Sequence, residues 1–178
     1  MIGASKPKLG VQSLSEPLDA VDAKILVLIQ HDAGLSVAEI AERVGLSSSP
    51  CWRRIKRLED TGIIQRRVTI LDREKLGLGF EVYCTAKLSL PTKENLDQFE
   101  QAVAKWPEVV QCATVTGAAD YELRIVTRDM HAFDDFLRDK ILSLGLVSNI
   151  ESRIVIRSVK NTTAAPLGLV SPYVSAQG

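Results

Sequence analysis

The spacing of apolar residues in this 178-residue chain changes once, and that change limits the folds open to it. From residue 18 to residue 62 the apolar residues recur three and four positions apart, which is the spacing of helices. From residue 80 onward, alternating stretches typical of strands are interrupted by two helical stretches. A chain of this length can form two small domains, so we expect an α+β protein with a helical domain followed by a domain built on a sheet.

Three short helices are expected in the first half, and the residues at their ends predict where they start and stop. Asp19 is placed as the N-cap of the first helix, with Asp22 three residues on, close to a capping box. Gly34 ends that helical pattern. Ser36 is placed to cap the second helix, and Gly45 ends it where a left-handed residue is least costly.

A third helix is expected to start within residues 46–50, where serine side chains can cap it and a proline is tolerated in the first turn. Gly62 ends it, and residues 63–71 are predicted to form a strand. The buried stripe of this third helix is expected to consist of Cys51, Ile55 and Leu58. Three short helices with a tight turn before the third, followed by a strand, outline a winged helix-turn-helix.

The face of the third helix opposite this stripe is basic, which predicts contact with nucleic acid. Arg53 is placed to hydrogen-bond guanine, and the serines before it to contact bases or phosphate. The other basic residues are better placed for phosphate. Trp52 either joins this surface or packs beneath the wing. Solvated charge is the alternative, but acidic residues are sparse here. The candidate DNA-binding residues are Ser47, Ser48, Ser49, Trp52, Arg53, Arg54, Lys56, Arg57, Arg66 and Arg67.

The second half follows the order β-α-β-β-α-β, which predicts a ferredoxin-like domain. The expected strands are 81–90, 109–116, 121–127 and 150–159, and the expected helices are 95–106 and 130–142. The chain is therefore divided into a flexible N-terminal arm (1–17), a winged helix-turn-helix (18–71), a linker (72–79), a ferredoxin-like domain (80–160) and a flexible tail (161–178).

Several runs of this sequence resemble the Lrp/AsnC (feast/famine) family of transcriptional regulators. They are LDAVDAKILVLI, VAEIAERVGLSSSPCWRRIKRLEDTGII and the turn TGAADY, and the resemblance covers residues 18–160. It implies a sequence-specific DNA-binding regulator whose second domain binds a small amino acid or related metabolite between subunits. The implied effector-binding residues are Thr114, Thr116, Gly117, Asp120, Tyr121 and Ser152.

The turn that carries most of these residues has two interpretations. Gly117 lets backbone N–H groups approach a carboxylate, and Asp120 can pair with an ammonium group. A plain hairpin turn also favours glycine and aspartate at these positions. Ala118 and Ala119 stand where many family members have an aromatic or charged residue, so the identity of an effector, and its presence, stay open.

DNA recognition by one such helix is weak, so we expect a homodimer on double-stranded DNA. A four-stranded sheet with helices on one face leaves the other face for a second subunit. Dimers are expected to assemble further into tetramers or octamers. One alternative is an architectural DNA-binding protein without an effector. A second is an enzyme on the ferredoxin-like domain, but residues 91–94 lack the Gly and Arg of a phosphate loop.

Composition excludes several other classes. The 22 Lys and Arg residues balance 22 Asp and Glu residues, and no apolar run is long enough to span a membrane. The first residues lack the apolar core of a secretory signal, so we expect a cytoplasmic protein. Cys51, Cys84 and Cys112 are spaced unlike metal ligands and have apolar neighbours, which predicts buried thiols. We expect no cofactor and no metal.

Overall fold

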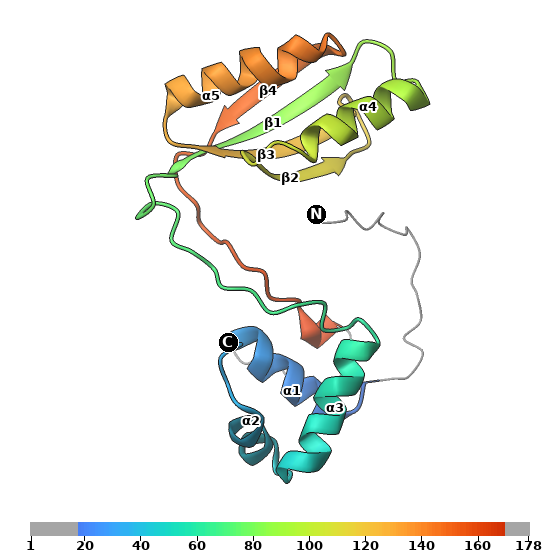
Figure 1. Cartoon of the computed structure of the whole chain (residues 1–178), viewed down its shortest axis with the longest axis vertical. Helices are drawn as coiled ribbons and strands as arrows, with labels where there is room; N and C mark the ends of the chain where they lie inside the picture. The colour runs from blue at the N-terminus through green and yellow to red at the C-terminus, as the bar shows by residue number, and fades with distance from the viewer. Residues whose placement is uncertain (1–17, 170–178) are drawn as a thin grey trace. The chain divides into compact units, whose positions relative to one another are not determined.

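The computed structural model describes residues 18–169. Its contacts divide the chain into two compact units (Figure 1). The helical unit consists of the described residues up to Thr69 together with those from Thr162, and the sheet unit is Ile70–Asn161. The expected N-terminal arm and residues 170–178 of the expected tail lie outside the described part of the chain.

The helical unit contains α1 (Ala20–His31), α2 (Val37–Val44) and α3 (Ser48–Asp60). The predicted caps of the first two helices are confirmed. Asp19 forms a capping box with Asp22, and Ser36 forms one with Glu39. Gly45 has φ +72°, a left-handed conformation that glycine adopts without steric cost.

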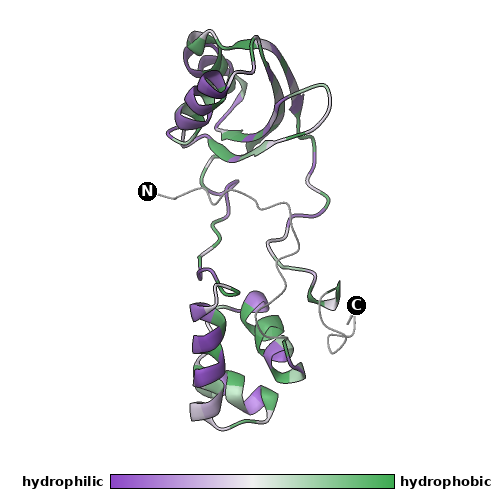
Figure 2. Cartoon of the chain, turned by 90° about the vertical axis from the view of Figure 1, so that its right-hand side faces the viewer, coloured by the Kyte–Doolittle hydropathy of each residue, from purple (hydrophilic) through white to green (hydrophobic). Residues whose placement is uncertain are grey.

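The third helix buries Cys51, Ile55 and Leu58, which confirms the predicted stripe. Its remaining surface is largely hydrophilic (Figure 2). The serine caps expected here are wrong in one respect, because the N-cap Ser47 makes no side-chain hydrogen bond to the helix. The first turn is held instead by the backbone, with the Cys51 N–H donating to the Ser47 carbonyl at 3.3 Å.

The strand predicted over residues 63–71 is wrong for the described chain. Ile63 and Ile64 pack against the helical core, but the residues after them join no sheet among the described residues. A strand requires a hydrogen-bonded neighbour, and the unit offers none next to this segment. Val68, Ile70 and Leu71 are left exposed.

The sheet unit is a four-stranded antiparallel sheet with the order β2-β3-β1-β4, which is the ferredoxin-like arrangement (Figure 1). Its strands are β1 (Phe80–Leu88), β2 (Val109–Thr114), β3 (Tyr121–Thr127) and β4 (Val147–Ile154). The helices α4 (Lys93–Val103) and α5 (Met130–Phe136) cover one face. The other face carries no helix among the described residues.

Two elements of the sheet unit differ most from the sequence expectation, and the ends of the other elements lie within three residues of it. The helix expected over 130–142 is α-helical only to Phe136 and continues as a π-helix (Leu137–Ile141) and a 3-10 turn (Leu142–Leu144). The last strand covers Val147–Ile154 instead of 150–159, because its antiparallel partner β1 pairs with it only between Val82 and Leu88. Val155 still donates to the Glu81 carbonyl at 2.9 Å, and the alternation that continues to Val159 has no partner strand.

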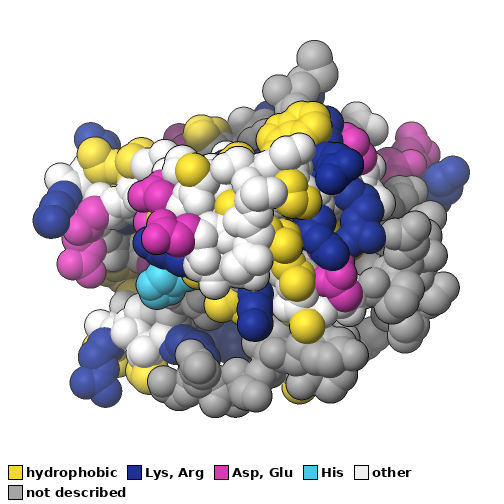
Figure 3. Space-filling model, turned by 90° about the horizontal axis from the view of Figure 1, so that it is seen from below, with side chains coloured by type: hydrophobic (Ala, Val, Ile, Leu, Met, Phe, Trp, Pro, Cys, Tyr) yellow, Lys and Arg dark blue, Asp and Glu magenta, His cyan; other side chains and the backbone are white. Residues whose placement is uncertain are grey.

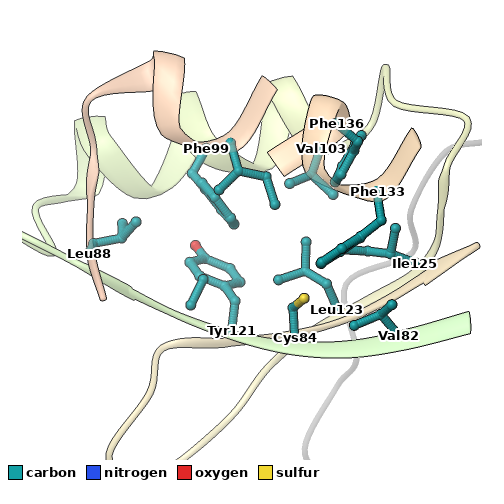
Figure 4. Packing of buried hydrophobic residues seen from close by; sticks show 12 residues of the cluster. Val82, Cys84, Leu88, Phe99, Val103, Tyr121, Leu123, Ile125, Phe133 and Phe136 are labelled. Carbon is teal, nitrogen blue, oxygen red and sulfur yellow. The ribbon is translucent and has the colours of Figure 1, made fainter. Parts of the chain in front are cut away.

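The core of the sheet unit lies between the sheet and its two helices (Figure 4). Alternate residues of β1 and β3 point into it, which follows from the two-residue period of a strand. Phe99 of α4 and Tyr121 of β3 pack with their ring centroids 4.6 Å apart. Its buried members include Val82, Cys84, Ala86, Leu88, Phe99, Tyr121, Leu123, Ile125, Phe133, Phe136 and Ile141.

The C-terminal segment contributes to the helical unit. Residues Leu167–Leu169 form a 3-10 turn, and Leu167 packs against the core of α1 and its neighbours. The Ala165 N–H donates to Oε1 of Gln30 at 3.1 Å. Part of the segment expected as a tail therefore belongs to the helical unit at the start of the chain.

Candidate functional site

The exposed side of α3 carries the centre of the predicted DNA-binding set. Ser49, Arg53 and Lys56 are exposed, since the buried stripe turns them away from the core. The side chain of Trp52 is 54% exposed, so it does not pack beneath a wing. These four side chains therefore present one hydroxyl, two cations and an indole to solvent.

Two arginines of the predicted set, Arg54 and Arg57, are held by carboxylates of the α1 N-terminus. Nη1 of Arg54 donates to Oδ1 of Asp22 at 2.9 Å and to Oδ2 of Asp19 at 2.6 Å. Nη2 of Arg57 donates to Oδ2 of Asp22. The Asp22 side chain is only 1% exposed, so a buried carboxylate of α1 binds two guanidinium groups of α3.

Electrostatics reinforce this network. The pKa of Arg54 is raised by its hydrogen bonds to Asp19 and Asp22. For Asp19 burial acts to raise the pKa, but the backbone N–H of Asp22 and the Arg54 guanidinium outweigh it and hold the pKa below its usual value. Two carboxylates and two guanidinium groups leave the network without net charge.

A shallow hollow of about 390 Å³ lies beside this network, lined by Asp19, Pro50, Arg53, Arg54 and Arg57. The space-filling view from below shows Lys and Arg side chains gathered on one part of the surface, with Asp and Glu side chains beside them (Figure 3). The hollow combines an exposed cation with cations that already have partners.

The second half of the predicted basic surface follows α3 along the chain. Arg66 is exposed, and Nη2 of Arg67 lies 3.6 Å from Oε1 of Glu59. Lys56 pairs with Asp60 at 2.9 Å, and this hydrogen bond raises the pKa of Lys56. Both ion pairs are exposed, where such contacts contribute little to stability, so these cations can exchange partners.

The candidate effector turn joins β2 to β3. Gly117 has φ +122°, a conformation that side-chain-bearing residues rarely adopt, and a Cβ there would meet no atom within 4 Å. Thr114 and Thr116 before it are exposed. The turn therefore offers backbone groups and two hydroxyls to a ligand.

Asp120 holds this turn in place through hydrogen bonds to β1 and across the turn itself. Its Oδ2 accepts the Leu88 N–H at 2.8 Å, and its own N–H donates to the Ala86 carbonyl at 3.0 Å. The Asp120 carbonyl accepts the Val115 N–H at 3.0 Å. Asp120 thus has a structural role in the sheet, and its second carboxylate oxygen, Oδ1, is the atom left for a ligand.

Tyr121 lies in the core and is 1% exposed. Its ring points toward α4 (Figure 4), and its hydroxyl donates to Oε1 of Glu100 at 3.1 Å. Burial, and then the nearby Glu100 carboxylate, raise the pKa of Tyr121. Its side chain supports the turn from inside the domain.

Ser152 is not brought together with the turn within one chain. It lies on β4, whereas Thr114 ends β2, and these strands are the two outer strands of the sheet. The Ser152 hydroxyl lies 3.3 Å from Sγ of Cys84. A site that uses both Ser152 and the Gly117 turn would have to draw on two chains.

Sequence reasoning identified Asp22 only as a helix cap and missed its contacts with α3. A signal was present, because Asp22 stands at helical spacing from the buried Ile25 and Ile29. A carboxylate on an apolar stripe needs a cationic partner on the element that it faces.

The cysteines and the membrane expectation also have structural outcomes. Cys51 and Cys84 are buried, but Cys112 is exposed because its strand β2 is an outer strand, so its predicted burial is wrong. Within residues 18–169 no group of three or more His, Cys, Asp and Glu side chains could hold a metal ion. The helices of the described chain are all too short or too polar to cross a membrane.

Comparisons with known proteins match both units. Residues 18–65 match the family model "Winged helix-turn-helix DNA-binding", and residues 81–165 match "Lrp/AsnC ligand binding domain". The chain is 37% identical over 150 residues to the DNA-binding transcriptional activator DecR of Escherichia coli K12, covering 84% of this chain and 99% of DecR. It is 39% identical over 148 residues to the proline dehydrogenase transcriptional activator of Rhizobium radiobacter, covering 83% and 95%.

A solved structure gives the same result. A transcriptional regulator from Neisseria meningitidis, in complex with L-Met, superposes with a TM-score of 0.83 at 38% identity, covering 86% of this chain and 99% of that chain. The agreement extends over both units and not over one domain alone.

Proposed function

This chain belongs to the Lrp/AsnC family of transcriptional regulators, and from that premise we propose that it acts as a homodimer that reads DNA with α3 and responds to a small amino acid. The observation that carries the proposal is the exposed face of α3, where Ser49, Arg53 and Lys56 stand opposite the buried stripe. Such a regulator acts on DNA in the cytoplasm. The relatives named above are regulators, which favours this function over an enzyme.

On DNA, Arg53 reads a guanine edge in the major groove, and the serines 47–49 contact bases or phosphate. Lys56, Arg66 and Arg67 contact backbone phosphate, which fixes register without reading sequence. Their exposed ion pairs with acidic neighbours can be given up, because such pairs contribute little.

A second copy of the chain is the partner that we assign to the open face of the sheet. On this face Tyr83 and Arg153 lie in one row, and Thr85, Glu122 and Glu151 lie in the next. A twofold axis between the rows sets the cationic row of each copy against the acidic row of the other. The measurement is the mass of the protein in solution, which also decides between dimer, tetramer and octamer.

The amino acid is assigned to the Gly117 turn and to Ser152 of a neighbouring chain. Backbone N–H groups at Gly117 bind its carboxylate, and Oδ1 of Asp120 binds its ammonium group. The separation of β2 and β4 at opposite edges supports a site shared between chains. The related Neisseria regulator was solved with L-Met, so methionine is the first amino acid to test.

Salt dependence tests the DNA-binding part. A dimer that places 6–10 cations on phosphate should lose ~10³–10⁵ in affinity between 50 and 200 mM salt. A response that is flat in salt contradicts the assigned phosphate contacts.

Thermal denaturation with a panel of amino acids tests the sensor part. A ligand at 100 times its Kd should add ~2.7 kcal/mol to stability. DNA binding without a response to any amino acid would instead identify an architectural protein.

A further inference from the structure

The buried carboxylate of Asp22 is costly unless it is paired, and the structure pairs it with α3. An ionised carboxylate removed from water must recover its lost hydration from charged hydrogen-bond donors. Asp22 receives them from Arg54 and Arg57, and it also accepts the Asp19 N–H at 3.3 Å as part of the α1 cap. Asp22 therefore joins the N-terminus of α1 to the middle of α3, beside the contact between Asp19 and Arg54.

The positions of the two arginines determine how α3 is turned about its axis. Arg54 and Arg57 are three residues apart, so they lie on one side of the helix, next to the buried stripe. Fixing both guanidinium groups on Asp22 leaves α3 little freedom to rotate. In that setting Arg53, which neighbours Arg54 in sequence, faces solvent.

The charge of the network argues against a direct role in binding phosphate. Asp19 and Asp22 balance Arg54 and Arg57, so the four side chains together attract a polyanion weakly. Moving either guanidinium onto DNA would remove one of the two cationic partners of the buried Asp22, which is costly.

We propose that Asp22 is a positioning residue for DNA recognition, and that Arg54 and Arg57 hold α3 on α1 instead of contacting phosphate. The proposal rests on the proposed DNA-binding function. It assigns sequence reading to Arg53 and phosphate binding to Lys56, Arg66 and Arg67. Disturbing Asp22 should weaken specific recognition without removing a phosphate contact.

The first test compares Arg54→Gln and Arg57→Gln with Lys56→Gln, a matched control on the same helix. Affinity is measured against salt concentration, using a duplex selected from a random-sequence library. Loss of one phosphate contact per subunit in a dimer lowers the slope of log affinity against log salt by about 1.8. We expect that change for Lys56→Gln, and a lower affinity with an unchanged slope for the two arginine variants. A slope reduced equally in all three would overturn the proposal.

The second test uses Asp22→Asn, with Glu42→Gln, an exposed carboxylate of α2 outside the network, as the control. We expect Asp22→Asn to lose about tenfold or more in affinity for the selected duplex, with little change for a random duplex. Equal losses on both duplexes would contradict a role in positioning.

A third readout does not depend on DNA and separates this proposal from the proposed function. Trp52 stands on the exposed side of α3, so iodide quenching of its fluorescence, in a Trp106→Phe background, reports how α3 is turned. Asp22→Asn should change the quenching constant, whereas Glu42→Gln should leave it near the wild-type value. An unchanged constant in a folded Asp22→Asn protein would overturn the proposal. A wild-type protein that binds neither duplex would refute the proposed function alone.

Discussion

Asp120 has two assigned roles that two substitutions can separate. Asp120→Ala removes the carboxylate oxygen that accepts the Leu88 N–H at 2.8 Å. Leu88 is buried, so its N–H loses this partner away from water. Hydrogen bonds to charged groups contribute about 1.5–3 kcal/mol, so we expect unfolding in urea to require about that much less free energy. Asp120→Asn keeps an oxygen for the same N–H, so its loss should stay below about 1 kcal/mol.

Ligand binding should rank the two variants differently. Asp120→Asn removes the negative charge assigned to the effector's ammonium group, so calorimetric titration with the most stabilising amino acid should show a loss of about tenfold or more. Asp97→Ala, at an exposed position on α4, is the control for both measurements. If Asp120→Ala is no less stable than Asp97→Ala, the Leu88 hydrogen bond does not hold the turn. If Asp120→Asn binds normally, the carboxylate is not a ligand.

Three further predictions concern other parts of the chain. Gly117→Ala should lower the free energy of unfolding by about 1–3 kcal/mol, because φ is +122° there; an unchanged urea midpoint would refute that strain. The pKa of Tyr121 is raised in the folded state. The contribution of Tyr121 to the free energy of unfolding is therefore fully present below the ordinary tyrosine pKa of about 10, and it is lost as the pH rises above that value. Tyr121→Phe should reduce that alkaline loss in urea titrations, and an identical loss would refute it. Leu167→Ala should cost the helical unit about 1 kcal/mol, whereas Leu169→Ala, 84% exposed, should cost less than about 0.5 kcal/mol; equal effects would refute the packing role of Leu167.

Local features of the sequence were enough to predict most elements. Capping residues such as Asp19 and Ser36 set helix starts because their hydrogen bonds are made within three residues. The stripe of α3 and the alternation of β1 predicted which side chains are buried. These predictions succeed because caps and burial stripes depend on residues within a single helix or strand.

The features that sequence reasoning missed depend on residues far apart in the chain. The segment 63–71 has the composition of a strand but no neighbour to pair with, and the alternation after Ile154 outlasts its partner strand. Cys112 has apolar neighbours in sequence but lies on an outer strand. The pairing of Asp22 with Arg54 spans 32 positions. The spacing of residues along the chain can indicate that Asp22 needs a cationic partner, but it does not identify the residue that supplies it.

The return of Leu167 to the helical unit makes the sheet unit, in covalent terms, an insertion within the DNA-reading domain. During synthesis α1 to α3 leave the ribosome first, yet the residue that completes their core is made after the entire sheet unit. The reading domain therefore reaches its full stability only when nearly all of the chain has emerged. The helical unit of a nascent chain thus gains its last core contact only after the sheet unit has been synthesised.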